Sequence, residues 1–206
     1  MKQRNELKND ITEYMKRLCE CGLTTTLGGN ISCRVNGGML ITPSSIDKKQ
    51  LTGSDIIEMD FEGNVIEGLH KPSIEHRIHS NIYKIQPDIN AIIHSHSFYS
   101  TLFSIIDKEI NVKITAETAK NVGIVGIADY ATMGTEQLAD SVSQKINNHN
   151  VVLMKNHGVV TVGKDLLEAF YRLEVVEQAA KLTYHSFGFS LSNISNEDIY
   201  KYLNDR

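Results

Sequence analysis

Short apolar runs joined in pairs by tight turns are the sequence feature that most constrains the fold. The apolar runs cover residues 31–35, 39–42, 91–95, 151–154 and 159–162. Asn36 and Gly37 separate the first two runs, and this dipeptide is typical of a hairpin turn. The last two runs flank a turn that contains His157, and the segment around Gly63 predicts a further hairpin. Because strands joined by hairpins run antiparallel, we expect a largely antiparallel sheet.

The longer gaps between these runs have apolar residues at helical spacing. Ser73, Thr135 and Asp165 stand where an N-cap would begin three of the helices. Helices are expected over residues 5–20, from Ser73 through Ile85, after His96 through Ile105, from Thr135 through Ile146, from Asp165 through about Tyr184, and from Ser195. We therefore predict an α/β fold made of one domain over residues 1–206. Its three αβα layers place helices over a mixed, largely antiparallel central sheet.

Composition excludes several classes of protein. The formal net charge of −4 gives no support to nucleic-acid binding. No apolar run approaches the length needed to cross a bilayer, and no secretory leader precedes the first helical pattern, so no membrane partner is expected. The three cysteines are odd in number, which argues against a disulfide framework. Their number favours a reducing compartment, and we predict a cytoplasmic protein.

Three histidines form a candidate metal site. His94 and His96 end an apolar strand, and alternation along that strand places both side chains on one face. His157 lies 61 residues after His96, between two further strands. Two ordinary histidines at a strand end remain an alternative for the first pair. Three imidazoles would leave one coordination position open, which is the pattern of a catalytic zinc rather than a structural one.

One acidic residue and several small polar residues are candidates for chemistry near such a site. Glu75 is expected in the first turn of its helix, where the helix dipole favours a carboxylate. The glycine-rich segment that ends at Gly29 and Asn30 can bring backbone N–H groups close to an anion. Hydroxyl groups follow in the same half of the chain at Ser44, Ser45 and Ser73. Each residue could instead be an ordinary turn or cap, but together they suggest a small phosphate or carboxylate pocket.

Two further histidines share the helix of Glu75. His76 and His79 have the i, i+3 spacing of metal ligands. We expect them instead to flank the helix surface or to contact a neighbouring subunit.

Six short motifs together resemble the class II aldolase and adducin-head superfamily, whose best-known members are L-fuculose-1-phosphate aldolases. They occur in the family's order and cover nearly the whole chain. The motifs are Leu27-Gly28-Gly29-Asn30-Ile31-Ser32, Leu40-Ile41-Thr42-Pro43-Ser44, Lys71-Pro72-Ser73-Ile74-Glu75, Ile93-His94-Ser95-His96-Ser97, Tyr130-Ala131-Thr132-Met133-Gly134-Thr135 and Lys155-Asn156-His157-Gly158-Val159.

The resemblance implies a role for each matching residue. His94, His96 and His157 match the family's ligands for Zn²⁺, or for another divalent cation. Glu75 matches its catalytic acid/base, which also ligates the metal when substrate is absent. The positions that match the substrate-phosphate site are Gly29, Asn30, Ser44, Ser45 and Ser73. The family also implies a homotetramer with active sites between subunits.

The implied activity is that of a zinc-dependent lyase. Such an enzyme would cleave a ketose 1-phosphate, for example L-fuculose 1-phosphate, to dihydroxyacetone phosphate and a short aldehyde. Three departures concern the substrate pocket: the family pattern has Thr-Gly at Ser44 and Ser45, a second serine at Ile74, and a pocket tyrosine at Thr115. A C-terminal tyrosine such as Tyr200 or Tyr202 could be the second proton donor that the family takes from a neighbouring subunit.

Three alternatives remain within the superfamily. A pentulose-phosphate 4-epimerase would use the same metal, but epimerases typically carry aspartate where this chain has Glu75. A dehydratase of a methylthio-sugar phosphate is a further enzymatic alternative. An adducin-like interaction module would keep the fold without the metal ligands, and the three histidines argue against it.

Overall fold

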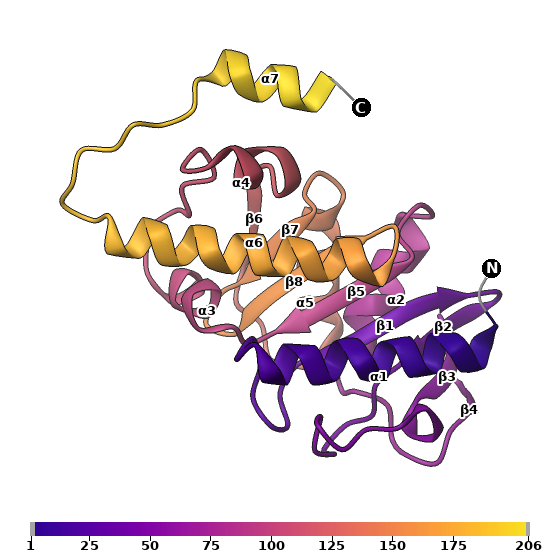
Figure 1. Cartoon of the computed structure of the whole chain (residues 1–206). Helices are drawn as coiled ribbons and strands as arrows, with labels where there is room; N and C mark the ends of the chain where they lie inside the picture. Colours follow the sequence, from indigo (N-terminus) through magenta and orange to yellow (C-terminus); the bar gives the residue numbers. More distant parts are fainter. Residues whose placement is uncertain (1–2, 205–206) are drawn as a thin grey trace.

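A single mixed sheet forms the centre of the protein, for which a computed structural model describes residues 3–204 (Figure 1). The strands of this described part are β1 (Asn30–Val35), β2 (Gly38–Ile41), β3 (Ile57–Asp60), β4 (Val65–Glu67), β5 (Ala91–Ser95), β6 (Val125–Ala128), β7 (Val151–Met154) and β8 (Gly158–Gly163). Their order in the sheet is β4-β3-β2-β1-β5-β8-β7-β6. Only β6 and β7 pair in parallel among these strands, so the predicted mixed, largely antiparallel sheet is confirmed.

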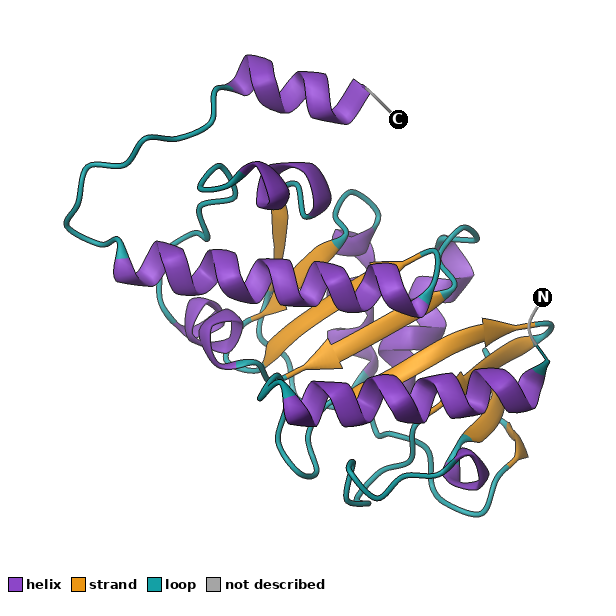
Figure 2. Ribbon diagram, viewed as in Figure 1, coloured by secondary structure: helices purple, strands orange, loops and turns teal. Residues whose placement is uncertain are grey.

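Helices cover both faces of the sheet and complete the predicted αβα layers (Figure 2). The helices are α1 (Arg4–Glu20), α2 (His76–Ile85), α3 (Phe98–Ile105), α4 (Ala116–Asn121), α5 (Glu136–Ile146), α6 (Leu166–His185) and α7 (Asn196–Asn204), with a 3₁₀ turn, η1, at Gly53–Asp55. In the view of Figure 1, α1 and α6 lie in front of the sheet, whereas α2 and α5 lie behind it. None of the described helices is both long and apolar enough to span a bilayer.

Alternation along the strands divides the core between the two layers. Ile93 of β5 packs in the cluster beneath α1 and α6, which includes Phe170. Its neighbour Ile92 packs in the opposite cluster, beneath α2 and α5, with Ile82 and Val142. All of these side chains are at most 2% exposed, and burying each stabilises the fold by about 1.5–3 kcal/mol. The same alternation directs the side chain of His94 towards α2.

Two predicted caps are confirmed and one is wrong. The side chains of Thr135 and Asp165 accept hydrogen bonds from the third residues of α5 and α6, each worth about 1 kcal/mol. Ser73 does not cap α2, because a separate turn closed by the hydrogen bond from His76 N to Ser73 O precedes the helix. The N-cap position of α2 is occupied by Glu75. The carboxylate still lies at the positive end of the helix dipole.

The short elements α4 and β6 were not predicted from the sequence. Both lie between residues 116 and 128, where the apolar pattern is brief. The three cysteines are free, in agreement with the expectation that no disulfide framework is present.

Candidate metal centre

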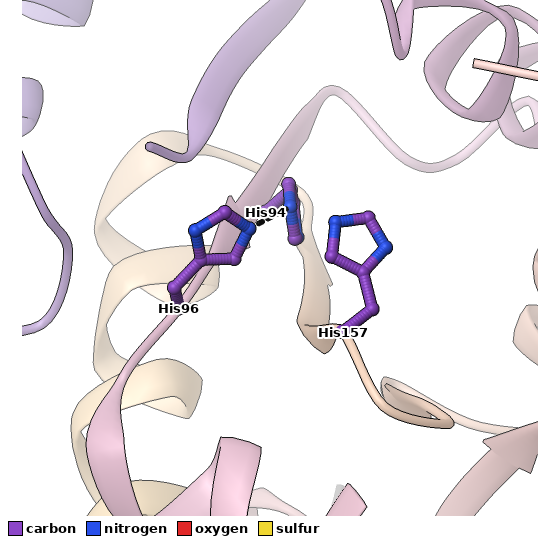
Figure 3. Close-up of side chains that lie close together, drawn as sticks. All are labelled: His94, His96 and His157. Carbon is purple, nitrogen blue, oxygen red and sulfur yellow. Dashed lines mark hydrogen bonds between the residues drawn. The ribbon is translucent and has the colours of Figure 1, made fainter. Parts of the chain in front are cut away.

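Three imidazoles from two distant parts of the chain meet at one end of the sheet (Figure 3). His94 ends β5 and His96 follows it, while His157 lies in the turn between β7 and β8. The pairing of β5 with β8, in which Ser95 lies opposite Val159, brings this turn beside the strand end. One ring nitrogen from each histidine lies within 4.8 Å of the other two. The predicted convergence of the three imidazoles is therefore present.

Local geometry presents the third imidazole to the first two. The turn that carries His157 closes with a hydrogen bond of 3.0 Å from its backbone N–H to Met154 O. Asn156, just before it, adopts a positive φ of 57°, a conformation that asparagine tolerates better than most residues. Asn156 thus reverses the direction of the backbone, and the side chain of His157 points at the other two imidazoles.

Hydrogen bonding leaves one nitrogen of His94 available to a metal. Its Nδ1 lies 3.0 Å from the carbonyl oxygen of Val159. Because a carbonyl only accepts, Nδ1 carries the hydrogen and Nε2 has a free lone pair. That Nε2 lies 3.0 Å from Nε2 of His96. The two Nε2 atoms therefore lie close enough together to bind one cation.

The carboxylate of Glu75 completes the cluster. Its Oε2 lies 3.2 Å from His94 Nε2, and its Oε1 lies 3.1 Å from His157 Nε2. Asn30 donates a hydrogen bond of 2.9 Å to Oε2. Oε1 is buried and accepts no hydrogen bond from the described residues. A buried carboxylate oxygen without a donor is suited to a cation.

Burial favours the neutral form of two of the imidazoles, those of His96 and His157. The pKa of His96 falls from 6.5 to about 4, mainly because the ring is buried and also because His94 and His157 lie beside it. Burial and the neighbouring His94 lower the pKa of His157 as well. For Glu75, burial alone would raise the pKa, but His94, His157 and the Asn30 hydrogen bond together lower it. Neutral imidazoles beside a carboxylate are the protonation states that a metal requires.

The donor set fits a divalent cation such as zinc. Zinc binds imidazole nitrogens at about 2.0–2.1 Å, so two nitrogens of a tetrahedral site lie about 3.3 Å apart. The separation of 3.0 Å between the Nε2 atoms of His94 and His96 is close to this value. Three imidazoles with a carboxylate beside them would hold the cation and leave access for a ligand.

The three predicted serines line one cavity next to the cluster. Ser44, Ser45 and Ser73 border a cavity of about 610 Å³ together with Lys71 and Arg77, whose side chains are cationic. The backbone N–H of Glu75 donates to Ser73 Oγ over 3.3 Å, which links the cavity to the candidate metal ligands.

The backbone of Ser45 has a positive φ of 58°. This left-handed conformation favours glycine, the residue that the family pattern has at the same position. A second, larger cavity of about 1350 Å³ lies at the opposite end of β1 and contains none of the predicted site residues.

Gly29 and Asn30 lie on the metal side of the site rather than in this cavity. Gly29 has a positive φ of 70°, and a Cβ there would come within 2.8 Å of the carbonyl oxygen of His94. The side-chain amide of Asn30 lies between Glu75 and His79. The structure therefore brings the predicted residues together in two adjoining groups, one around the histidines and one around the serines.

A family model, the class II aldolase and adducin N-terminal domain, matches residues 9–184. The chain belongs to this family. An L-fuculose phosphate aldolase of Methanococcus maripaludis is 38% identical over 178 residues, which is 85% of this chain and 96% of that protein. A solved structure of an L-fuculose 1-phosphate aldolase has a TM-score of 0.89 at 34% identity and covers 97% of this chain and 95% of its own.

A second solved structure shares even more of the fold. YgbL from Klebsiella pneumoniae, which has a provisional assignment as an aldolase, epimerase or decarboxylase, has a TM-score of 0.92 at 25% identity. The match covers 98% of this chain and 100% of that one. The class II aldolase fold is thus shared from end to end.

One histidine of this class II aldolase family member does not lie where its sequence predicts. His79, expected at the helix surface, is fully buried and contacts Asn30 and Ser32. It lies one helical turn after Glu75 and beside the apolar Ile78 and Ile82, a spacing that could have identified its buried face. His76 is half-buried, and its Nδ1 accepts no hydrogen bond from the described residues.

Two remaining predictions concern tyrosines of the family pattern. The side chains of Tyr200 and Tyr202 lie outside the described residues, so a role as proton donor stays a prediction. Thr115, at the position of the family's pocket tyrosine, caps α4 by accepting a hydrogen bond from Thr118 N.

Proposed function

We propose that this protein is a metal-dependent aldolase that cleaves a ketose 1-phosphate, such as L-fuculose 1-phosphate, to dihydroxyacetone phosphate and a short aldehyde. The observation that carries the proposal is the convergence of His94, His96 and His157 on one point, with the carboxylate of Glu75 beside it. The relatives named L-fuculose phosphate aldolase support the same reaction class.

The cavity next to the histidines supports a phosphorylated substrate. Hydroxyl groups of Ser44, Ser45 and Ser73 can donate to phosphate oxygens, and Lys71 and Arg77 supply positive charge. In this proposal the backbone N–H groups of Gly29 and Asn30 reach the substrate from the metal side of the site, because the side chain of Asn30 is engaged with Glu75. The phosphate would anchor the substrate so that its carbonyl end reaches the histidines.

Glu75 would carry the proton in this reaction. When bound by the three histidines, a divalent cation supplies a Lewis acid that stabilises negative charge on the substrate's ketone oxygen. The C4 hydroxyl would give its proton to a second group, for which a C-terminal tyrosine such as Tyr200 or Tyr202 is the candidate, and its oxygen becomes that of the aldehyde. As the C3–C4 bond breaks, its electron pair stays with C3, and the carboxylic acid form of Glu75 gives its proton to that carbon. In the condensation direction the carboxylate removes the same proton from dihydroxyacetone phosphate. The hydrogen bond from Asn30 holds the group in place for both directions.

We further propose zinc as the native cation and a homotetramer with active sites between subunits. Apolar side chains beside the site residues support a subunit interface there: Leu27, Ile74 and Phe98 are 59%, 51% and 69% exposed. They lie within two residues of Gly29, Glu75 and His96 along the chain. Light scattering of the purified protein tests the tetramer, and a monomer with full activity would refute it.

Metal analysis combined with an aldehyde-release assay tests the main proposal. Purified protein is expected to hold about one divalent cation per chain and to release an aldehyde and dihydroxyacetone phosphate from at least one member of a ketose 1-phosphate panel. Pentulose phosphates in the same panel identify an epimerase, because the product would be a stereoisomer without aldehyde. A dehydratase would release water from a methylthio-sugar phosphate. Protein that neither holds nor requires a cation would contradict the proposal.

A further inference from the structure

A chain of five hydrogen-bonded side chains leads from Glu75 into the core between β1 and α2. Asn30 Nδ2 lies 2.9 Å from Glu75 Oε2, and Asn30 Oδ1 lies 2.6 Å from His79 Nε2. The other ring nitrogen, His79 Nδ1, lies 2.6 Å from Ser32 Oγ, which lies 2.8 Å from the hydroxyl oxygen of Tyr83. The chain thus links two residues of β1 with three residues at the start and along one face of α2.

Each hydrogen in this chain has only one consistent position. The carboxylate of Glu75 accepts, so the amide nitrogen of Asn30 donates to it and the amide oxygen is left as an acceptor. His79 must then donate from Nε2, which leaves Nδ1 as an acceptor for the hydroxyl of Ser32. Ser32 in turn accepts from the hydroxyl of Tyr83. Every donor therefore points towards Glu75.

The surroundings of these five side chains hold their hydrogen bonds in this single arrangement. All five side chains are at most 6% exposed, and His79 is fully buried. Burial lowers the pKa of His79 to about 3, so the ring stays neutral. Burial also raises the pKa of Tyr83 well above its ordinary value, so its hydroxyl remains a donor. Water cannot replace a lost partner in such a place without a cavity to hold it.

We propose that His79 is a positioning residue that fixes the carboxylate of Glu75 through the amide of Asn30. This inference rests on the proposed function, in which Glu75 carries the proton. Among the described residues, the hydrogen bonds of His79 go to Asn30 and Ser32 rather than to the candidate metal ligands, and His79 does not line the cavity proposed for the phosphate. Its effect is therefore on the orientation of Glu75 and on proton transfer rather than on substrate binding.

Three substitutions distinguish positioning from packing. His79→Leu leaves the Asn30 oxygen without its donor, so the amide can rotate away from Glu75. His79→Gln keeps an N–H group that can reach Asn30. Ile82→Ala removes a fully buried side chain of the same helix that has no polar contact, and it is the control for general loss of packing.

The kinetic test compares kcat with KM for cleavage. For His79→Leu we expect a fall in kcat of about 10–100-fold with KM nearly unchanged and the cation retained, since losing a partner behind a reactive group typically costs this much. His79→Gln should recover most of the lost kcat, and Ile82→Ala should keep the wild-type kcat. Wild-type kcat in His79→Leu, or a His79→Gln variant as slow as His79→Leu, would overturn the proposal.

A spectroscopic test does not depend on turnover. Two-bond ¹H–¹⁵N spectra of metal-free protein with ¹⁵N-labelled histidine report which ring nitrogen carries the hydrogen. We expect one histidine, absent from the spectrum of His79→Gln, to show the Nε2–H form unchanged between pH 5 and 8. A hydrogen on Nδ1 would overturn the directed chain. If the wild type cleaves no ketose phosphate, the proposed function fails, whereas this spectrum still decides the state of His79.

Discussion

Replacing Gly28 with alanine places a methyl group against a candidate metal ligand. Gly28 does not have a positive φ, so alanine fits its backbone without strain. The added Cβ would lie 2.6 Å from His96 Nδ1 and 2.5 Å from Thr25 Oγ1. Both neighbours are side chains, so the substitution moves the imidazole rather than the strand.

The size of the effect follows from these distances. Carbon and nitrogen atoms in contact lie about 3.5 Å apart, so the His96 ring must move by about 0.9 Å. Metal–ligand distances tolerate about 0.2 Å. A misplacement near 1 Å costs about 10²-fold, which corresponds to about 2.7 kcal/mol. We therefore expect Gly28→Ala to weaken zinc binding and to lower kcat/KM, each by about 100-fold.

The assay pairs this variant with a control in the same segment. An alanine Cβ at Gly22 would have nothing within 4 Å, but the positive φ of 67° there makes alanine cost about 1–2 kcal/mol. Gly22→Ala should thus lower the melting temperature by a few degrees and leave zinc affinity unchanged. Calorimetric titration of metal-free protein with zinc measures both variants. Zinc affinity in Gly28→Ala equal to that of the wild type would refute the placement of His96 as a ligand.

Three further outcomes are expected. Glu75→Gln keeps the side-chain volume, so metal analysis should find the cation retained while aldehyde release falls by about 10²–10⁴-fold; normal turnover would remove Glu75 from the reaction. Zinc at 100 times its dissociation constant should stabilise metal-free wild type by about 2.7 kcal/mol in thermal unfolding, and an equal shift in His157→Ala would contradict the site. Burial lowers the pKa of His79 from 6.5 to about 3. Between these values the unfolded chain binds the proton, so stability is complete above about pH 6.5 and is lost as the pH falls, by about 1.4 kcal/mol per pH unit. Urea unfolding of metal-free protein at several pH values should show a shallower loss in His79→Gln, and identical slopes would exclude this contribution.

Much of the fold follows from local signals in the sequence. The Asn36-Gly37 turn and the hairpin that contains His157 appear where the apolar runs predict them, because such turns are encoded by two or three residues. The caps at Thr135 and Asp165 are equally local. By contrast, β6 pairs in parallel with β7, and its four residues, alternately half-buried and buried, are too few to predict a strand without that partner.

The sequence predicts which residues form the candidate site, but it does not predict which of them hydrogen-bond to one another. The motifs indicate which residues belong to it, since His94, His96, His157 and Glu75 match a family pattern. The hydrogen-bond partner of each residue depends on how α2 packs against β1, and no local pattern encodes that packing. The predicted surface position of His79 was wrong for this reason. Its ring is buried between α2 and β1, where it contacts Ser32 and Asn30, and those partners become visible only when both elements are in place.

The pairing of β5 with β8 also sets when a growing chain could bind the proposed zinc ion. During synthesis His94 and His96 leave the ribosome well before His157, and two imidazoles alone make a weak chelator. The third donor becomes available only after β8 has emerged and aligned with β5. Binding of the proposed zinc ion would then be a late step in maturation. Tight binding of zinc would indicate that β5 and β8 have already paired.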